Sequence, residues 1–104
     1  MNDQFLEMPD REQLELSEVL EALSDPIRLE ILSALAAQGE VACGLIPLRV
    51  SDSTRSHHFK ILRRAGLTAT RVSGTQRLVS LRRDDLEARF PGLLDSVLAA
   101  TAAR

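Results

Sequence analysis

The sequence holds one cysteine, no tryptophan, no tyrosine and only three phenylalanines among its 104 residues. The single thiol, Cys43, excludes an internal disulfide and is typical of a reducing compartment. With so few aromatic rings, leucine, isoleucine, valine and alanine must fill the core, and such a composition favours helices. A domain of this size buries a smaller fraction of its surface than a larger one, so a partner subunit would add useful burial.

Several function classes lack their signatures. No run of about 20 apolar residues is present to span a membrane, and the start MNDQFLEMPDREQ is acidic and polar, unlike a signal peptide. The sequence has no glycine-rich phosphate loop and no cluster of metal ligands. We therefore expect a single cytoplasmic domain over residues 1–104 that is not an enzyme and needs no cofactor, with residues 1–11 frayed.

The net charge of −2 hides a strong segregation of charge along the chain. Residues 1–30 carry nine acids and two arginines, whereas residues 49–83 carry nine cations against Asp52 alone. A basic block of this size indicates a surface for a polyanion such as nucleic acid. Charge alone equally allows a solvated face that is paired with the acidic N-terminal segment.

The spacing of apolar residues predicts two helices in the first part of the chain. Residues 12–23 carry leucines and a valine at three- and four-residue intervals, with glutamates on another face. A second helix is expected from Asp25, a good N-cap followed by Pro26, to about Ala37, and Gly39 stops it. The apolar stripe of the first helix is Leu16, Val19, Leu20 and Leu23.

One further clear helix precedes a hairpin. Residues 40–50 contain Pro47 and predict only a brief helical turn or two. Residues 52–65 predict a helix with Ser51 or Ser53 as its cap and Gly66 as its left-handed end. Two β-like runs follow, joined by a short loop that contains glycine, and this pattern is typical of a hairpin. The runs and their loop are 67–72, 76–81 and Ser73-Gly74-Thr75.

The last part of the chain predicts a helical region capped by Asp84, interrupted by Pro91-Gly92 and resumed over residues 93–102. The whole order is helix, helix, short helix, basic helix, basic hairpin and helix. This order predicts a mainly α fold with about five helices and a two-stranded wing, which is a winged helix-turn-helix.

Three stretches of the sequence are informative when they are taken together. ALSDPIRLEILSAL (22–35) and SDSTRSHHFKILRRAGL (51–67) resemble the helix pattern ALadptRlrIL..L and the recognition-helix pattern SqstvSrHLkvLreaGLv of one family, the ArsR/SmtB-type repressors. VSGTQRLVSL (72–81) resembles the family's wing. The resemblance covers about residues 15–82 and implies a dimeric bacterial transcriptional repressor that binds operator DNA and is released by a ligand, usually a metal ion.

The recognition helix carries most of the predicted DNA-binding residues. The major groove admits an α-helix whose first turns read base edges. The family pattern implies Ser53, Ser56 and His57 as base readers, with Thr54, His58 and Lys60 serving phosphates or local packing. Arg55 replaces a small apolar residue of the family and either contacts DNA or reaches around to solvent, and Arg64 is a further candidate. The alternative is an ordinary surface helix.

The wing supplies the second predicted contact. Thr75, Gln76 and Arg77 stand at or beside its tip, with Arg71 across the pair. Such groups bind phosphates, and an arginine at a wing tip can also enter the minor groove. The alternative is an exposed hairpin whose arginines only prevent edge-to-edge pairing.

The metal sites of the family do not carry over to this sequence. Family members place two cysteines in an ELCVCDL stretch, where this chain has GEVACGLIPL with Cys43 alone. Others use Asp and His on the last helix, where this chain has Asp95 and no histidine. His57 and His58 are adjacent and point about 100° apart on a helix, so they do not converge on one ion. We expect no metal site, and Cys43 is either a redox sensor or a core thiol.

The first and last helices complete the expectation. Family members pair these helices across a two-fold axis, which implies that residues 12–23 and 91–102 form a homodimer; the alternative is that their apolar stripes fold back within one chain. We predict a homodimeric repressor of a pseudo-palindromic operator. The rival hypothesis is a winged-helix module that binds proteins and lacks sequence-specific DNA binding.

Overall fold

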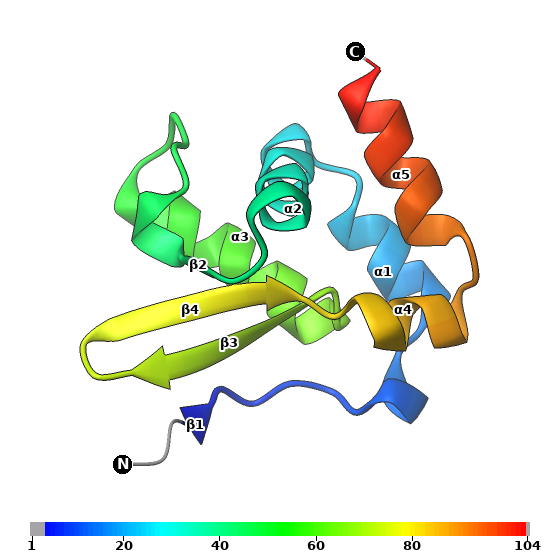
Figure 1. Cartoon of the computed structure of the whole chain (residues 1–104), viewed down its shortest axis with the longest axis horizontal. Helices are drawn as coiled ribbons and strands as arrows, with labels where there is room; N and C mark the ends of the chain where they lie inside the picture. The colour runs from blue at the N-terminus through cyan, green and yellow to red at the C-terminus, as the bar shows by residue number, and fades with distance from the viewer. Residues whose placement is uncertain (1–3, 104) are drawn as a thin grey trace.

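The computed structural model describes residues 4–103, and its helices pack around a small twisted sheet with a projecting hairpin (Figure 1). The fold is the predicted winged helix-turn-helix. Its elements, in chain order, are β1 (Gln4–Phe5), η1 (Arg11–Gln13), α1 (Leu16–Ala22), α2 (Pro26–Gln38), β2 (Val41–Ala42), η2 (Cys43–Leu45), α3 (Asp52–Ala65), β3 (Thr68–Ser73), β4 (Gln76–Leu81), α4 (Arg83–Arg89) and α5 (Leu93–Ala102).

The predicted caps set the bounds of α2 and α3. The Asp25 carboxylate accepts hydrogen bonds from the backbone N–H groups of Ile27 and Arg28, at 2.7 and 3.2 Å, so α2 starts at Pro26. At α3 the cap is Ser51, whose hydroxyl accepts from the Thr54 N–H. Gly66 ends α3 at φ 89°, a left-handed conformation that glycine adopts without steric cost.

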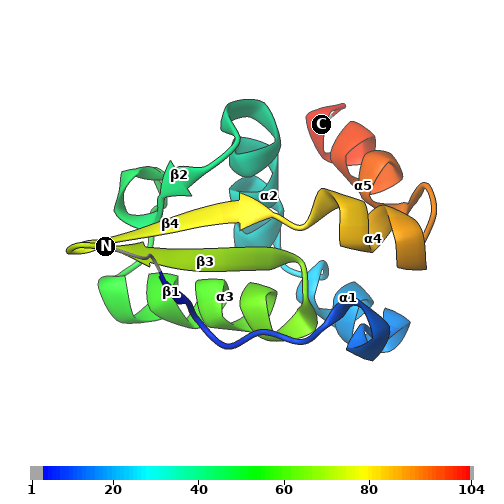
Figure 2. The same ribbon diagram turned by 60° about the horizontal axis from the view of Figure 1, so that its bottom comes forward.

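The wing is the β3–β4 hairpin, and its pairing runs from Thr68 opposite Leu81 to Ser73 opposite Gln76. Two short strands that the sequence did not predict extend it, giving the strand order β1-β3-β4-β2. Helix α3 lies along one face of this sheet, and its N-terminal end points the same way as the wing tip (Figure 2). The fold therefore presents the start of α3 and the tip of the hairpin at one end of the molecule.

The core sits between the helices and the sheet and is aliphatic, as the composition predicts. Helices α2 and α3 contribute their apolar sides, and the strands and the last two helices close the core. Its most deeply buried large side chains include Leu14, Ile31, Leu32, Leu35, Leu62, Leu67, Leu86, Val19 and Val79.

The predicted helix over residues 12–23 is wrong in its first part. Residues 11–13 form a 3₁₀ turn, Leu14 is extended, and α1 begins only at Leu16. Leu14 is 1% exposed and inserts into the core, which requires the chain to leave the helical path there. Its carbonyl accepts a hydrogen bond from the Arg89 side chain at 2.7 Å, which holds this extended residue in place.

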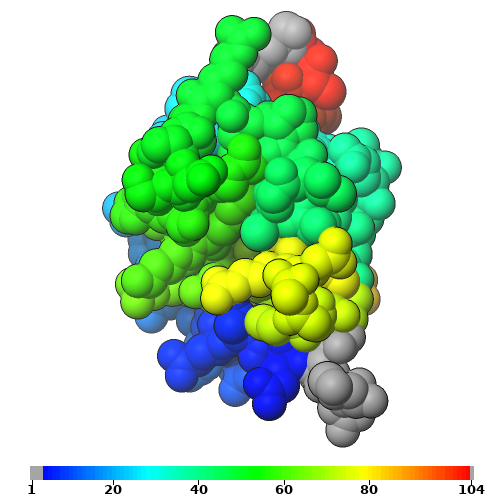
Figure 3. Space-filling view, turned by 90° about the vertical axis from the view of Figure 1, so that its left-hand side faces the viewer, coloured from blue at the N-terminus to red at the C-terminus, as the bar shows by residue number. Residues whose placement is uncertain are grey.

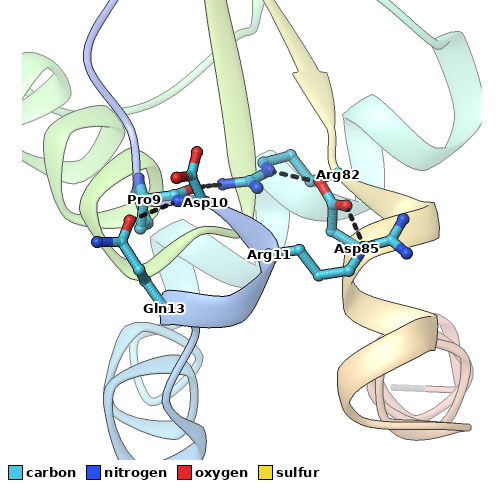
Figure 4. A network of polar contacts seen from close by, with 6 residues as sticks. All are labelled: Pro9, Asp10, Arg11, Gln13, Arg82 and Asp85. Atoms are coloured by element: carbon cyan, nitrogen blue, oxygen red, sulfur yellow. Dashed lines mark hydrogen bonds and ion pairs between the residues drawn. The ribbon is translucent and has the colours of Figure 1, made fainter.

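The predicted fraying of residues 1–11 is also not what the structure shows, although residues 1–3 lie outside the described part. Gln4 and Phe5 pair antiparallel with β3, and the Leu6 N–H donates to the Thr70 carbonyl. The buried Arg82 guanidinium donates to the Pro9 carbonyl at 2.6 Å and to Asp85 at 3.0 Å (Figure 4). An N-terminal arm is thus fastened along the sheet and against the start of α4.

Smaller differences concern α4 and the segment before α3. Helix α4 starts at Arg83 with Arg82 in the cap position, so Asp84 lies in its first turn instead of capping it. The expected turn within residues 40–50 is η2, and two residues before it pair with β4 as β2. The break at Pro91-Gly92 and the final helix occur as predicted, with Gly92 at φ 80° just before α5.

Candidate DNA interface

Helix α3 separates an outward polar face from an inward apolar face. Phe59 and Leu62 are buried, at 7% and 0% exposure, and fix the helix to the core. The outward face carries only polar or charged side chains in its first turns, and these are exposed: Ser53, Thr54, Ser56, His57 and Lys60. This surface has the residue types that read base edges and bind phosphates.

The serines and the threonine of the first turn are partly engaged by the helix cap. The Ser51 hydroxyl donates to the Thr54 hydroxyl at 3.0 Å and lies 3.2 Å from the Ser53 hydroxyl. Within residues 4–103, the side chains of Ser56, His57 and Lys60 make no hydrogen bond or ion pair, and they remain available to a ligand.

His58 takes part in local packing, and a phosphate contact by this residue stays a prediction. The residue is 8% exposed, and its Nδ1 lies 3.2 Å from Nη1 of the buried Arg28. Arginine can only donate, so Nδ1 must accept and the proton of the neutral ring sits on Nε2. Arg28 also donates to the carbonyls of Ala22 and Glu21, at 2.6 and 3.3 Å. The pair ties the end of α1 and the start of α2 to the recognition helix.

Arg55 binds carbonyl groups of its own chain. Its guanidinium turns back over the preceding loop and donates to the carbonyls of Ile46 and Cys43, at 2.6 and 3.2 Å. The residue is half-buried. It therefore holds η2 and its following loop against α3, and a DNA contact by this residue stays a prediction.

The wing divides its polar residues between exposed and paired positions. Thr75, Gln76 and Arg77 are exposed beside Gly74, which turns the hairpin at φ 61°. Arg71 stands opposite Leu78, so strand alternation places it on the other face from Arg77. Arg71 instead binds Glu40 through two hydrogen bonds of 3.1 and 2.5 Å, which lower the pKa of that carboxyl group below its usual range.

Arg63, in the last turn of α3, is a residue that the sequence analysis missed. With Ser56 and Phe59 it lines a hollow of about 90 Å³ between α3 and the sheet, whose other walls are Cys43, Arg55, Thr70, Arg77 and Val79. Burial and the positive charges of Arg77 and Arg64 lower the pKa of Arg63 below its usual value. The sequence could have pointed to Arg63 through its spacing, because it lies about two helical turns beyond Ser56 and on the same side of α3.

Arg64 points elsewhere. It is exposed, but it lines a hollow with Glu18 and Glu21 of α1 and a second one with Glu7 and Met8 of the N-terminal arm. This position faces away from the wing and toward acidic side chains. Its guanidinium makes no hydrogen bond within the described residues 4–103.

Comparison with known proteins agrees with this geometry. Residues 25–69, which span α2, α3 and the start of β3, match the model of the bacterial regulatory protein, arsR family. An uncharacterized HTH-type transcriptional regulator of Bacillus subtilis, YceK, is 38% identical over 96 residues, which cover 89% of this chain and 96% of that protein. The arsenical resistance operon repressor of Staphylococcus xylosus is 40% identical over 70% of this chain and 71% of its own length.

This chain belongs to the ArsR family of bacterial regulatory proteins. A transcriptional repressor SmtB homolog of Synechocystis adds 40% identity over 66% of the chain and 45% of that protein. Membership confirms the predicted resemblance and makes the chain a DNA-binding transcriptional regulator and not an enzyme.

The ArsR-family chain keeps Cys43 half-buried against the core, at the edge of two surface hollows. This placement leaves both the sensor and the core-thiol hypotheses as predictions. Among the residues that the structure describes, no three histidine, cysteine or acidic side chains come together in a way that could hold a metal ion. None of the helices in that part of the chain is long and apolar enough to cross a bilayer.

The apolar stripe of α1 in this ArsR-family chain is only half covered. Val19 and Leu23 are buried, whereas Leu16 and Leu20 are 49% and 47% exposed. Leu20 also lines an apolar hollow between α1, α2 and α5, together with Leu23, Leu29, Val97, Ala100 and Thr101. The single chain therefore leaves an apolar surface at the helices that the family resemblance assigns to dimerisation.

Proposed function

We propose that this chain is a homodimeric repressor that binds a pseudo-palindromic operator through α3 and the wing. The observation that carries the proposal is the shared direction of two exposed polar surfaces: the first turns of α3 and the tip of the β3–β4 hairpin (Figure 2). A helix that enters the major groove and a wing that contacts the adjacent backbone need this arrangement. Because a bacterial transcriptional regulator must reach DNA, this proposal places the protein in the cytoplasm.

Within this proposal, Ser53, Ser56 and His57 read base edges, and Lys60, Thr75, Gln76 and Arg77 contact phosphates. Their exposure and the absence of a competing carboxylate partner within residues 4–103 support these roles. His58, Arg55 and Arg71 support the interface from behind, since each is bound to other groups of the chain. Thr54 is shared between the cap of α3 and the outward surface.

The dimer brings two such surfaces to one DNA duplex. The exposed leucines of α1 and the hollow beside α5 provide apolar area that a second copy would cover. A two-fold dimer then presents two copies of α3 to half-sites about one helical turn apart. An arsenical resistance operon repressor and an SmtB repressor homolog are among the similar proteins, which supports repression over activation.

Selection of bound duplexes from a random pool tests the proposal directly. We expect a pseudo-palindromic sequence to emerge, with affinity that falls steeply as salt rises, by about 0.9 log units per neutralised phosphate and log unit of salt. His57→Ala should change the ranking of base substitutions in the selected site. A protein that selects no sequence and shows no salt slope would instead be the rival winged-helix protein-binding module.

A further inference from the structure

The hollow between α3 and the sheet is lined by two arginines that no described residue in the hollow neutralises, and one of them, Arg63, carries an unsatisfied donor. Nε of Arg63 is buried and has no hydrogen-bond partner in the part of the chain that the structure describes. A buried donor without a partner is costly, and more so on a charged group, so its presence calls for an explanation. A ligand that accepts from this nitrogen, once the side chain turns its N–H into the hollow, would remove the cost.

The walls of the hollow indicate the chemical class of that ligand. Arg77 adds a second guanidinium, which makes no hydrogen bond or ion pair with other described residues, and Ser56 and Thr70 add hydroxyl groups. No carboxylate lines the hollow among residues 4–103. The positive charge gathered here is therefore uncompensated, and the groups present are those that bind oxyanions in proteins.

The size and position of the hollow also fit an oxyanion. A volume of about 90 Å³ exceeds the space of about 10–15 Å³ that a single water needs, and it is enough for a tetrahedral oxyanion. The segments around η2 and the start of α3 meet the wing on one face of the molecule (Figure 3). An anion in the hollow would bridge the two surfaces that the proposed function assigns to DNA.

We propose that the hollow between α3 and the wing is a binding site for a phosphate group, with Arg63 as its central donor. The phosphate can come from the DNA backbone or from free inorganic phosphate, because the recognising chemistry is the same. In both cases Arg63 donates to the phosphate oxygens, and Arg77 neutralises charge from the wing. The DNA source rests on the proposed function, whereas the free-anion source does not.

Titration of the DNA-free protein with inorganic phosphate, at constant ionic strength held with chloride, tests the free-anion source. The arginine Nε–H signals are followed by nitrogen-15 NMR. We expect a saturable shift of the Arg63 signal and none for Arg83 of α4, which is exposed and paired with Asp95 of α5. Arg63→Gln should abolish phosphate binding, Arg63→Lys should weaken it, and the matched Arg83→Gln should retain it.

The DNA source is tested by the salt dependence of operator binding. Arg63→Gln should reduce the slope of log affinity against log salt by about 0.9, the value for one neutralised phosphate, and Arg83→Gln should leave it unchanged. Circular dichroism checks that both variants are folded. We expect Arg63→Gln to fold, because the buried nitrogen makes no hydrogen bond within residues 4–103 that the substitution could remove.

The outcomes separate the two sources and the two proposals. If phosphate shifts the Arg63 signal but Arg63→Gln leaves the salt slope unchanged, the site binds a free anion. If only the salt slope changes, the site binds a phosphate of the DNA backbone. If both effects occur, the site accepts phosphate from both sources. Equal shifts at Arg63 and Arg83, or no effect in both experiments, overturn the site. A wild-type protein that binds no duplex would refute the repressor but leave the phosphate titration intact.

Discussion

The two ends of the molecule use arginine in opposite ways. At the recognition end, formed by the first turns of α3 and the wing tip, Arg77 is exposed and makes no ion pair within residues 4–103. At the anchoring end, formed by η1 and the start of α4, Arg82 is buried and binds Pro9 and Asp85, and Arg11 binds the other oxygen of Asp85 at 2.7 Å (Figure 4). Arg77 at the recognition end is thus available to a ligand, whereas Arg11 and Arg82 at the anchoring end join segments of the chain.

This difference shows why a block of positive charge in a sequence is an incomplete guide to a binding surface. Residues 49–83 read as one basic stretch, yet four of their arginines are bound to groups of the same chain: Arg55, Arg71, Arg82 and Arg83. The remaining cations of the stretch have no such partner among the described residues. Only the structure separates the arginines that build the fold from those available to a polyanion.

The largest predicted effect compares two glycines with positive φ. Gly66 is where α3 turns toward β3, and a Cβ there would lie 2.0 Å from Cδ2 of the buried Leu14. Gly74 at the wing tip has nothing within 4 Å. We expect Gly66→Ala to cost about 3 kcal/mol, from left-handed strain and overpacking together, and Gly74→Ala about 1 kcal/mol from strain alone. Urea unfolding of both variants measures the difference, and equal losses would contradict it.

A second prediction compares folding stability and DNA binding for one arginine at each end of the molecule. Arg82→Met should reduce the free energy of unfolding by about 2 kcal/mol, because it leaves Asp85 with one partner fewer and frees the N-terminal arm. It should leave the preference among operators unchanged. Arg77→Met should change stability by less than about 0.5 kcal/mol while weakening binding to all duplexes alike. Denaturant unfolding and binding to selected duplexes would be measured on both variants.

Two outcomes would contradict this comparison of Arg77 with Arg82. If Arg77→Met destabilised the fold as much as Arg82→Met, the wing arginine would belong to the structural group. If Arg82→Met altered the ranking of operators at equal folded fraction, the anchoring end would take part in recognition.

The sequence predicted the elements with local signals and missed those that depend on distant contacts. Caps at Asp25 and Ser51, the stop at Gly66 and the glycine-tipped hairpin are local, and α2, α3 and the wing follow them closely. The pairing of residues 4–5 with β3 and the extended Leu14 depend on contacts with segments more than 50 positions away. Apolar periodicity carries no information on such contacts.

The same division holds for the site. Exposure of Ser56, His57 and Arg77 follows from their position on an outward face, which periodicity supplies. The burial of His58 does not, since it depends on Arg28 arriving from another helix. Arg63 was missed because its significance comes from the sheet residues that complete the hollow with it.

A third prediction compares the adjacent histidines of α3. His58→Ala should cost about 1–2 kcal/mol of folding free energy, because it removes a buried side chain and leaves Nη1 of Arg28 without its acceptor. His57→Ala should change stability by less than about 0.5 kcal/mol, since that ring is exposed. Thermal unfolding of the two variants measures the difference. If His57→Ala lost more stability than His58→Ala, His57 and not His58 would be the histidine that packs in the core.

The smallest predicted effect is a pH dependence that both ends share for different reasons. Hydrogen bonds from Arg11, and then from Arg82, lower the pKa of Asp85, and the bond from Arg71 lowers that of Glu40. A carboxyl group whose folded-state pKa is below its unfolded value of about 4 stabilises the fold above that value. This stabilisation is lost as the pH falls through the folded pKa.

Asp85→Asn and Glu40→Gln should therefore each flatten the acid limb of a stability profile measured between about pH 2 and 6. The flattening should be greater for Asp85, which is less exposed than Glu40, at 28% against 37%, because solvent screens an exposed pair more strongly. If Glu40→Gln had the larger effect, the wing would be held to β2 more firmly than the N-terminal arm is held to α4, and the contrast between the two ends would be reversed.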